Sequence, residues 1–198
     1  MADRGALARR SGPVLIASGV LLLAYAGVGW AGGLLARDRA RSQWEAGEAR
    51  RAVAAASALP LTGTGRVEAA GAPIARLIVP RLGLDEIVVE GVGDRSLRAG
   101  PGHLPGSALP GESGNAVLSA HRDRHFSRLD ELVVGDSAIT IAGARTVRWR
   151  VAARRVVDRD APALFTSSEP RLTLTTCWPV RYLGPAPDRL VVTLEPAP

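Results

Sequence analysis

An uncharged, strongly apolar run over residues 11–36, with arginines on both sides, constrains this chain more than any other feature. At about 1.5 Å per residue, a helix over residues 13–36 is roughly 36 Å long, which exceeds a hydrocarbon core of about 30 Å. The run therefore predicts one transmembrane helix over 13–36, preceded by a tail over 1–12. A cleavable signal peptide is the alternative, although its apolar region is typically only about 7 to 15 residues long.

The charge distribution narrows the possible partners. All 25 basic residues are arginine and the formal net charge is +6, but the arginines are spread over strand-like stretches and the flanks of the apolar run. Only 2 Tyr and 2 Phe are available for base stacking, so the pattern disfavours nucleic-acid binding. Arginines lie on both sides of the predicted span, so charge bias alone leaves its orientation open.

After the apolar run, the composition changes twice. Residues 37–57 are rich in Ala, Arg and Glu and favour a helix, with Gly47 as its weak point. Residues 59–73 are rich in Pro, Gly and Thr, which break regular structure. We therefore expect a helical stalk and linker over 37–73 and a separate domain over 74–198.

The C-terminal domain is predicted to be all-β, since short apolar stretches alternate with Gly and Pro and helical periodicity is nearly absent. The alternation of Trp149 with Arg148 and Arg150, for example, indicates one buried and one solvated strand face. A helical turn is expected over 126–132. The number of strands favours a small β-barrel or sandwich. Strands are expected at residues 75–79, 86–90, 115–120, 137–142, 146–157, 171–177 and 189–194.

The single cysteine, Cys177, ends the strand-like stretch RLTLTTC and is followed by Trp178 and Pro179. Strand periodicity places Leu172 and Leu174 on one face and the thiol on the other, so the leucines can face the core while the thiol faces a groove. A lone cysteine is usually a small buried apolar residue, so a catalytic role needs partners. With one cysteine, no intrachain disulfide can form.

Two residues can supply those partners. His121 directly follows the apolar stretch NAVLSA, and Arg189 opens the stretch RLVV, which we expect to pair with the cysteine strand. A thiolate attacks a carbonyl, an imidazole protonates the leaving amine, and a guanidinium stabilises an oxyanion. Alternatively, Arg189 pairs with a nearby carboxylate. His121 and His125 have zinc-protease spacing but no Glu beside His121, so no metal site is predicted.

These motifs occur together in one known family. The TLTTC stretch at 173–177, the HRD tripeptide at 121–123 and the later DRLVV stretch, in this order, resemble the sortases, which are membrane-anchored cysteine transpeptidases. The resemblance runs from about residue 75 to the C-terminus. The upstream stretch at 81–103 and a tryptophan in the stalk most resemble class GN sortases of Gram-negative bacteria, with class D next. The GDRSL stretch at 93–97 is assigned no role.

The resemblance implies a closed eight-stranded sortase-type β-barrel with Cys177 as nucleophile and His121 as general acid and later base. It implies that Arg189 binds substrate and stabilises the oxyanion, assisted by Thr176, without a cofactor. The implied substrate is an exported protein with an LPxTG-like C-terminal signal, cut after Thr through a thioacyl intermediate and passed to an unidentified amine. A sortase would be a single-pass inner-membrane protein with a cytoplasmic tail and a periplasmic barrel. A non-catalytic, membrane-tethered barrel that binds extended peptides is the competing hypothesis.

Overall fold

The computed structural model describes residues 4–56, 69–159 and 167–198, and in this part of the chain eight strands close into one barrel. The strand order around the barrel is β1-β2-β3-β4-β7-β8-β6-β5. The β2–β3 and β4–β7 pairs are parallel, whereas the other pairs are antiparallel. The predicted closed eight-stranded barrel is therefore confirmed.

The strands lie close to the positions that the residue pattern predicts. β5 has the expected bounds, and the other predicted strands differ at their ends by a few residues. The two-residue strand β3 was not predicted, because a pair of residues carries no periodicity. The bounds are β1 Pro73–Val79, β2 Leu84–Glu90, β3 Gly102–His103, β4 Asn115–Ser119, β5 Ser137–Ala142, β6 Arg145–Asp158, β7 Arg171–Trp178 and β8 Asp188–Pro196, with short 3-10 turns at Pro80–Leu82 and Leu129–Glu131.

The GDRSL stretch, to which the sequence analysis assigned no role, contains most of a short helix, α2 Asp94–Ala99. Six residues are too few to show helical periodicity in a sequence, although Leu97 and Ala99 are buried and hold the helix against the barrel. The Ser96 hydroxyl donates to the backbone carbonyl of Glu90 at 3.0 Å and ties α2 to the end of β2.

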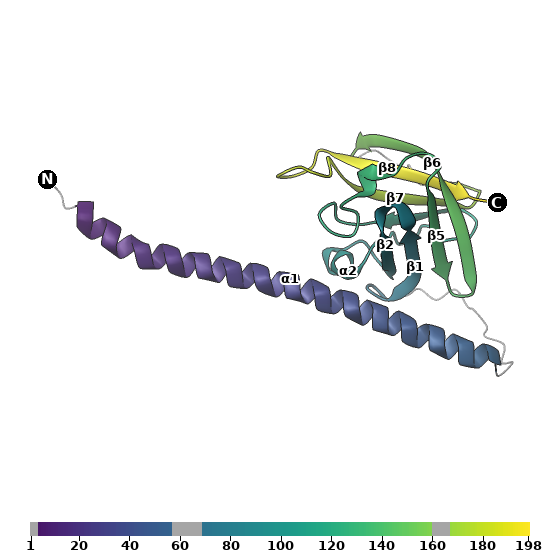
Figure 1. The fold of residues 1–198 in the computed structure, drawn as a ribbon, viewed down its shortest axis with the longest axis horizontal. Helices are drawn as coiled ribbons and strands as arrows, with labels where there is room; N and C mark the ends of the chain where they lie inside the picture. The colour runs from purple at the N-terminus through teal and green to yellow at the C-terminus, as the bar shows by residue number, and fades with distance from the viewer. Residues whose placement is uncertain (1–3, 57–68, 160–166) are drawn as a thin grey trace.

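The N-terminal quarter of the chain forms one long helix, α1 Arg4–Ala56. Gly47 does not interrupt it, so the predicted span and the helical part of the stalk are continuous. Figure 1 shows the N-terminal half of α1 projecting beyond the barrel, while its C-terminal half passes beside β1, β2 and α2. The stretch Leu15–Arg51 contains a window apolar enough to cross a membrane, and no residue of that window is buried. Most of the linker expected before residue 74 lies outside the described residues.

The C-terminal half of α1 is docked on the barrel rather than standing apart from it. Ala40 and Trp44 are buried against Ile87 and Val89 of β2 and Ala99 of α2. Arg37, which precedes these two residues on α1, donates hydrogen bonds to both carboxylate oxygens of Glu86, at 3.0 and 2.5 Å. Apolar packing and a bidentate ion pair therefore hold the helix on β2.

Side chains from strands around the barrel and from the segment at 126–132 fill the barrel interior. Those that are fully buried include Phe126, Trp149, Leu172 and Leu190. Burying a side chain of this kind contributes about 1.5–3 kcal/mol to the free energy of unfolding. The indole N–H of Trp149 donates to the Thr140 hydroxyl at 2.7 Å, so its polar atom is satisfied within the core. The filled interior makes β4, β7 and β8 a rigid support for the groups at their ends.

Candidate active site

Cys177 and Arg189 are direct neighbours across the β7–β8 ladder. The two strands are antiparallel, and their register pairs Cys177 with Arg189 and Thr175 with Val191. Directly opposed residues of an antiparallel pair point to the same face, with Cβ atoms about 4.5–5.5 Å apart. Strand register alone therefore brings the thiol and the guanidinium to one side of the sheet. The Cys177 thiol is free and partly exposed.

His121 reaches the same place from β4. β4 runs parallel to β7, with Ser119 opposite Thr175, and the chain leaves β4 for His121 where β7 continues to Cys177. The carboxyl ends of parallel neighbours lie at the same edge of the sheet, so His121 and Cys177 lie at the same end of the barrel. His121, Cys177 and Arg189 all line one cavity of about 420 Å³.

The rest of this cavity is mainly apolar. Its walls include Val92, Leu97, Leu104, Val157 and Val191, whose side chains come from α2 and from the loops and strands around the three polar groups. A cavity of this composition can hold an extended peptide with apolar side chains while the three polar groups face its backbone.

The alternating faces of β7 follow the sequence pattern. Leu172 and Leu174 are fully buried in the core, and Thr175 and Cys177 line the cavity. Thr176 is 1% exposed, and its hydroxyl donates to the backbone carbonyl of Ala120 at 2.7 Å. The Thr176 side chain thus anchors the residue before His121, and assistance to the oxyanion by Thr176 stays a prediction.

Asp94 of α2 is a site residue that sequence reasoning missed. His121 Nε2 lies 3.6 Å from Asp94 Oδ1, and Arg98 donates to Asp94 Oδ2 at 2.9 and 2.7 Å. Hydrogen bonds from Arg98, its charge and that of His121 hold the pKa of the Asp94 carboxyl below its usual value. An ionised carboxylate therefore faces one ring nitrogen of His121. The GDRSL stretch supplies this residue, but only the position of α2 shows its partner.

Arg122 is the second residue that sequence reasoning missed, although it lies within the HRD tripeptide. Its guanidinium donates to the backbone carbonyls of Pro179 at 2.9 Å and Gly184 at 2.6 Å, and it lies 5.6 Å from the ring centroid of Tyr182. These contacts fasten the β7–β8 loop to the segment that carries His121. Arg122 therefore links the segment that follows β4 to the loop that follows β7.

The other two histidines have different surroundings. His103 is buried, with Nδ1 2.8 Å from Glu90 Oε2 and Nε2 close to the Ser107 hydroxyl and the Ala108 carbonyl, which orders the loop after β3. His125 Nδ1 lies 3.4 Å from Glu86 Oε1, on the side of the barrel that faces α1. His121 and His125 thus have separate partners. No cluster of three metal-binding side chains occurs among residues 4–56, 69–159 and 167–198.

A thiol, an imidazole and a guanidinium on one cavity wall of a closed β-barrel form the kind of site that a cysteine transpeptidase uses. A profile of the sortase domain matches residues 77–197, which is more than half of the chain. The chain belongs to the sortase family.

Individual relatives agree with this assignment. Sortase D of Bacillus subtilis is 34% identical over 118 residues, which are 59% of this chain and 60% of that protein. Sortase C-1 of Actinomyces oris is similar in structure, with a TM-score of 0.58 and 30% identity over 64% of this chain and 75% of the other. The Clostridium perfringens Sortase D5 transpeptidase has a TM-score of 0.64 over 85% of this chain and 99% of its own, but 20% identity, and so supports the fold alone.

Proposed function

We propose that this protein is a membrane-anchored cysteine transpeptidase that cleaves an LPxTG-like C-terminal signal after its Thr and transfers the new carboxyl end to an amine. The observation that carries the proposal is the convergence of Cys177, His121 and Arg189 on one cavity. The mainly apolar walls of that cavity suit a sorting signal whose leucine and proline are apolar.

In the first step, the Cys177 thiolate attacks the carbonyl carbon between Thr and Gly, and the carbonyl electrons move onto its oxygen. Arg189 stabilises this oxyanion, since its charge and its donors are permanent. Collapse of the intermediate breaks the C–N bond, and protonated His121 gives its proton to the leaving amine. The products are a Thr thioester on Cys177, a free amine and neutral His121.

In the second step, an acceptor amine attacks the thioester carbonyl. Neutral His121 takes the proton from the attacking nitrogen, and Cys177 leaves as a thiolate when the intermediate collapses. A new amide has formed, and His121 is again protonated. Asp94, which is ionised and faces His121, suits the cationic form of the ring that the first step needs.

We place the barrel on the outer side of the cytoplasmic membrane, where exported substrates pass, with α1 as a single N-in span. Support comes from the exposed apolar window of α1, which no part of the barrel covers. The class GN resemblance of the residues at 81–103 favours a Gram-negative, periplasmic setting, whereas the relative from Bacillus subtilis is named sortase D.

Intact-mass measurement tests the proposal directly. Incubated with an LPxTG-like peptide and no amine, the full chain in detergent should gain the mass of the peptide acyl portion. The adduct should be absent in Cys177→Ala and should be discharged by an added amine. Peptide binding without any adduct or cleavage would instead support a non-catalytic peptide-binding barrel, and an adduct in Cys177→Ala would overturn the assignment of the nucleophile.

A further inference from the structure

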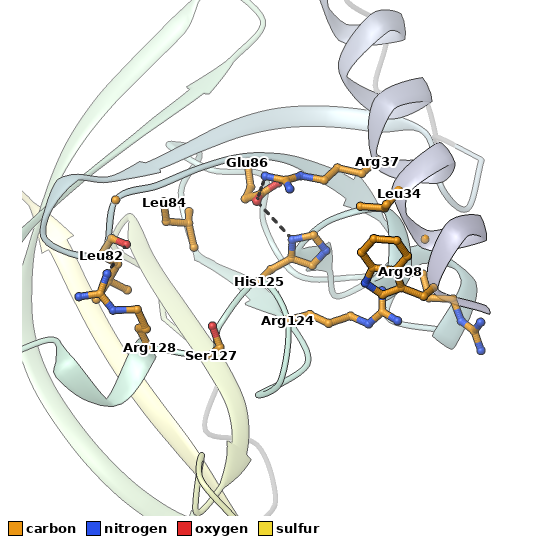
Figure 2. Close-up of a pocket in the computed structure, with 13 residues that line it drawn as sticks. Leu34, Arg37, Leu82, Leu84, Glu86, Arg98, Arg124, His125, Ser127 and Arg128 are labelled. Atoms are coloured by element: carbon orange, nitrogen blue, oxygen red, sulfur yellow. Dashed lines mark hydrogen bonds and ion pairs between the residues drawn. The ribbon is translucent and has the colours of Figure 1, made fainter. Parts of the chain in front are cut away.

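A second cavity, of about 310 Å³, lies where α1 meets the barrel (Figure 2). One wall comes from α1 and includes Trp30, Gly33 and Leu34. The other comes from the barrel, from the stretch at 82–86, the segment at 124–128 and Arg98. It shares no residue with the cavity of Cys177, so it needs an explanation of its own.

The charges around this junction cavity do not cancel. Arg37, Arg98, Arg124 and Arg128 line it, against one carboxylate, that of Glu86. Three of the arginines have ion-pair partners, because Arg37 pairs with Glu86, Arg98 with Asp94 and Arg128 with Glu131. Within the described ranges of the chain, no carboxylate is recorded within ion-pair distance of Arg124. The cavity therefore keeps an unbalanced positive charge at Arg124.

The Arg124 guanidinium lies directly on α1. A Cβ atom at Gly33 would stand 2.6 Å from Arg124 Nη1, so the absence of a side chain at Gly33 leaves the space that this charge occupies. Figure 2 shows the Arg124 side chain running beneath the His125 ring toward the helix. Arg124 thus lines the junction cavity with its guanidinium against a glycine of the helix.

His125 adds a buried donor or acceptor without a partner. Its side chain is 8% exposed, and its Nδ1 faces Glu86. Its Nε2 is buried and has no hydrogen-bond partner, and in Figure 2 the ring lies between Glu86 and the part of α1 that carries Leu34. An unsatisfied buried nitrogen destabilises the fold, and a hydrogen bond to a ligand oxygen at this position would remove that penalty.

The position of the cavity along α1 indicates the ligand. Trp30 and Leu34 are 65% and 42% exposed at the end of the apolar run, and Arg37 is the first charge after it. Tryptophan is enriched where hydrocarbon meets the headgroup layer, and basic pockets beside membrane helices bind anionic headgroups. An anion at this level of a membrane helix is most commonly the phosphate of a lipid.

We propose that the junction cavity binds the phosphate of an anionic phospholipid, whose oxygens accept hydrogen bonds from the Arg124 guanidinium and from an N–H at Nε2 of His125. This inference rests on the membrane anchoring proposed above. Arg124 also lines a neighbouring cavity that reaches from the apolar part of α1 to His121. A bound headgroup would thus lie between the membrane helix and the segment that carries the catalytic histidine.

The test uses the full chain in detergent and measures binding of phosphatidylglycerol and phosphatidylcholine by native mass spectrometry. Wild type should prefer phosphatidylglycerol, and Arg124→Gln should bind it about tenfold more weakly, the effect of losing a hydrogen bond from a charged group. The matched control is Arg95→Gln, which removes the same charge from an exposed residue of α2 outside the junction cavity and should change affinity less than about twofold. His125→Leu is the second variant and should also weaken binding.

Three results would overturn the inference. Equal losses in Arg124→Gln and Arg95→Gln would mean general attraction to basic surfaces. Displacement of the lipid by inorganic phosphate or glycerol phosphate at similar concentrations would identify a site for a free anion. Failure of the chain to float with phosphatidylcholine vesicles would remove the anchoring itself. Acylation of Cys177 is measured separately in the same preparation. Its absence would contradict the proposed enzyme activity and would not affect the proposal of lipid binding.

Discussion

The two cavities of this protein are built in different ways. In the Cys177 cavity, backbone pairing positions the functional groups: Arg189 is opposite Cys177 in the β7–β8 ladder, and His121 follows the parallel neighbour β4. In the junction cavity, long side chains that reach between α1 and the barrel position the charges, as Arg37 does with Glu86. A site set by strand register depends on the whole barrel, whereas a site set by side-chain pairs depends on the docking of one helix.

Replacing Arg189 should have the largest effect and should separate the two cavities most clearly. Arg189→Ala should lower kcat for peptide cleavage by about 10²–10³-fold, as loss of one oxyanion donor does. Arg189→Lys should recover only part of the loss, since lysine cannot present two parallel donors. Phosphatidylglycerol binding should stay unchanged. Near wild-type kcat in Arg189→Ala would remove the guanidinium from the mechanism.

Replacing Arg122 tests whether strand register alone is enough to align His121 with Cys177. Arg122→Ala removes two hydrogen bonds to the backbone carbonyls of Pro179 and Gly184. We expect kcat to fall by about tenfold, because charge-assisted hydrogen bonds of this kind are worth about 1.5–3 kcal/mol before their partial exposure is discounted.

The positioning role of Arg122 has its own readout. Amide exchange in the loop at 179–184 should become faster in Arg122→Ala, while KM changes little. Arg95→Ala, which removes an exposed arginine of α2, is the control and should leave both measurements unchanged. Slow exchange in the loop together with full activity would show that the β7–β8 ladder positions Cys177 without help.

Replacing Glu86 tests how far the junction cavity depends on the docking of α1. Glu86→Gln leaves Arg37 and His125 without their carboxylate, and we expect the free energy of unfolding to fall by about 1–2 kcal/mol, since Glu86 is buried but Arg37 is half exposed. Protease cleavage within α1 should become faster, whereas thioacyl formation at Cys177 should persist. Loss of acylation would mean that the active site also depends on helix docking.

The smallest expected effect concerns Asp85, which accepts two hydrogen bonds from Arg76 at 2.7 and 2.6 Å at the edge of the docked helix. Those bonds hold the pKa of Asp85 below its usual value. Asp85 therefore stabilises the fold above its unfolded pKa of about 3.9, and the stabilisation is lost as the pH falls further through the lower folded pKa.

Asp85→Asn should reduce the free energy of unfolding by about 0.5 kcal/mol at pH 7, because the pair is partly exposed. The difference between variant and wild type should vanish at the acid end of a denaturant series. A difference that grew on acidification would contradict the assigned direction of the pKa.

Residue patterns in the sequence predict the lining of the Cys177 cavity well and that of the junction cavity poorly. Alternation along β7 is enough to separate Leu172 and Leu174 from Cys177. The HRD and DRLVV stretches lead to the two partners of Cys177, which are His121 and Arg189. Asp94 and Arg122 escape such reasoning because their contacts join segments that are distant in the chain. The contact of Arg124 with Gly33 depends on how α1 lies on the barrel, which no local pattern records.

The continuity of α1 sets the distance between the membrane and the barrel. The same helix carries the exposed apolar window and the docked residues Ala40 and Trp44, with no hinge between them. If α1 anchors the protein in a membrane, the Cys177 cavity lies at a constant distance from the bilayer surface. Substrates would be selected by how far their cleavage point extends from the membrane surface, in addition to the amino acids around it.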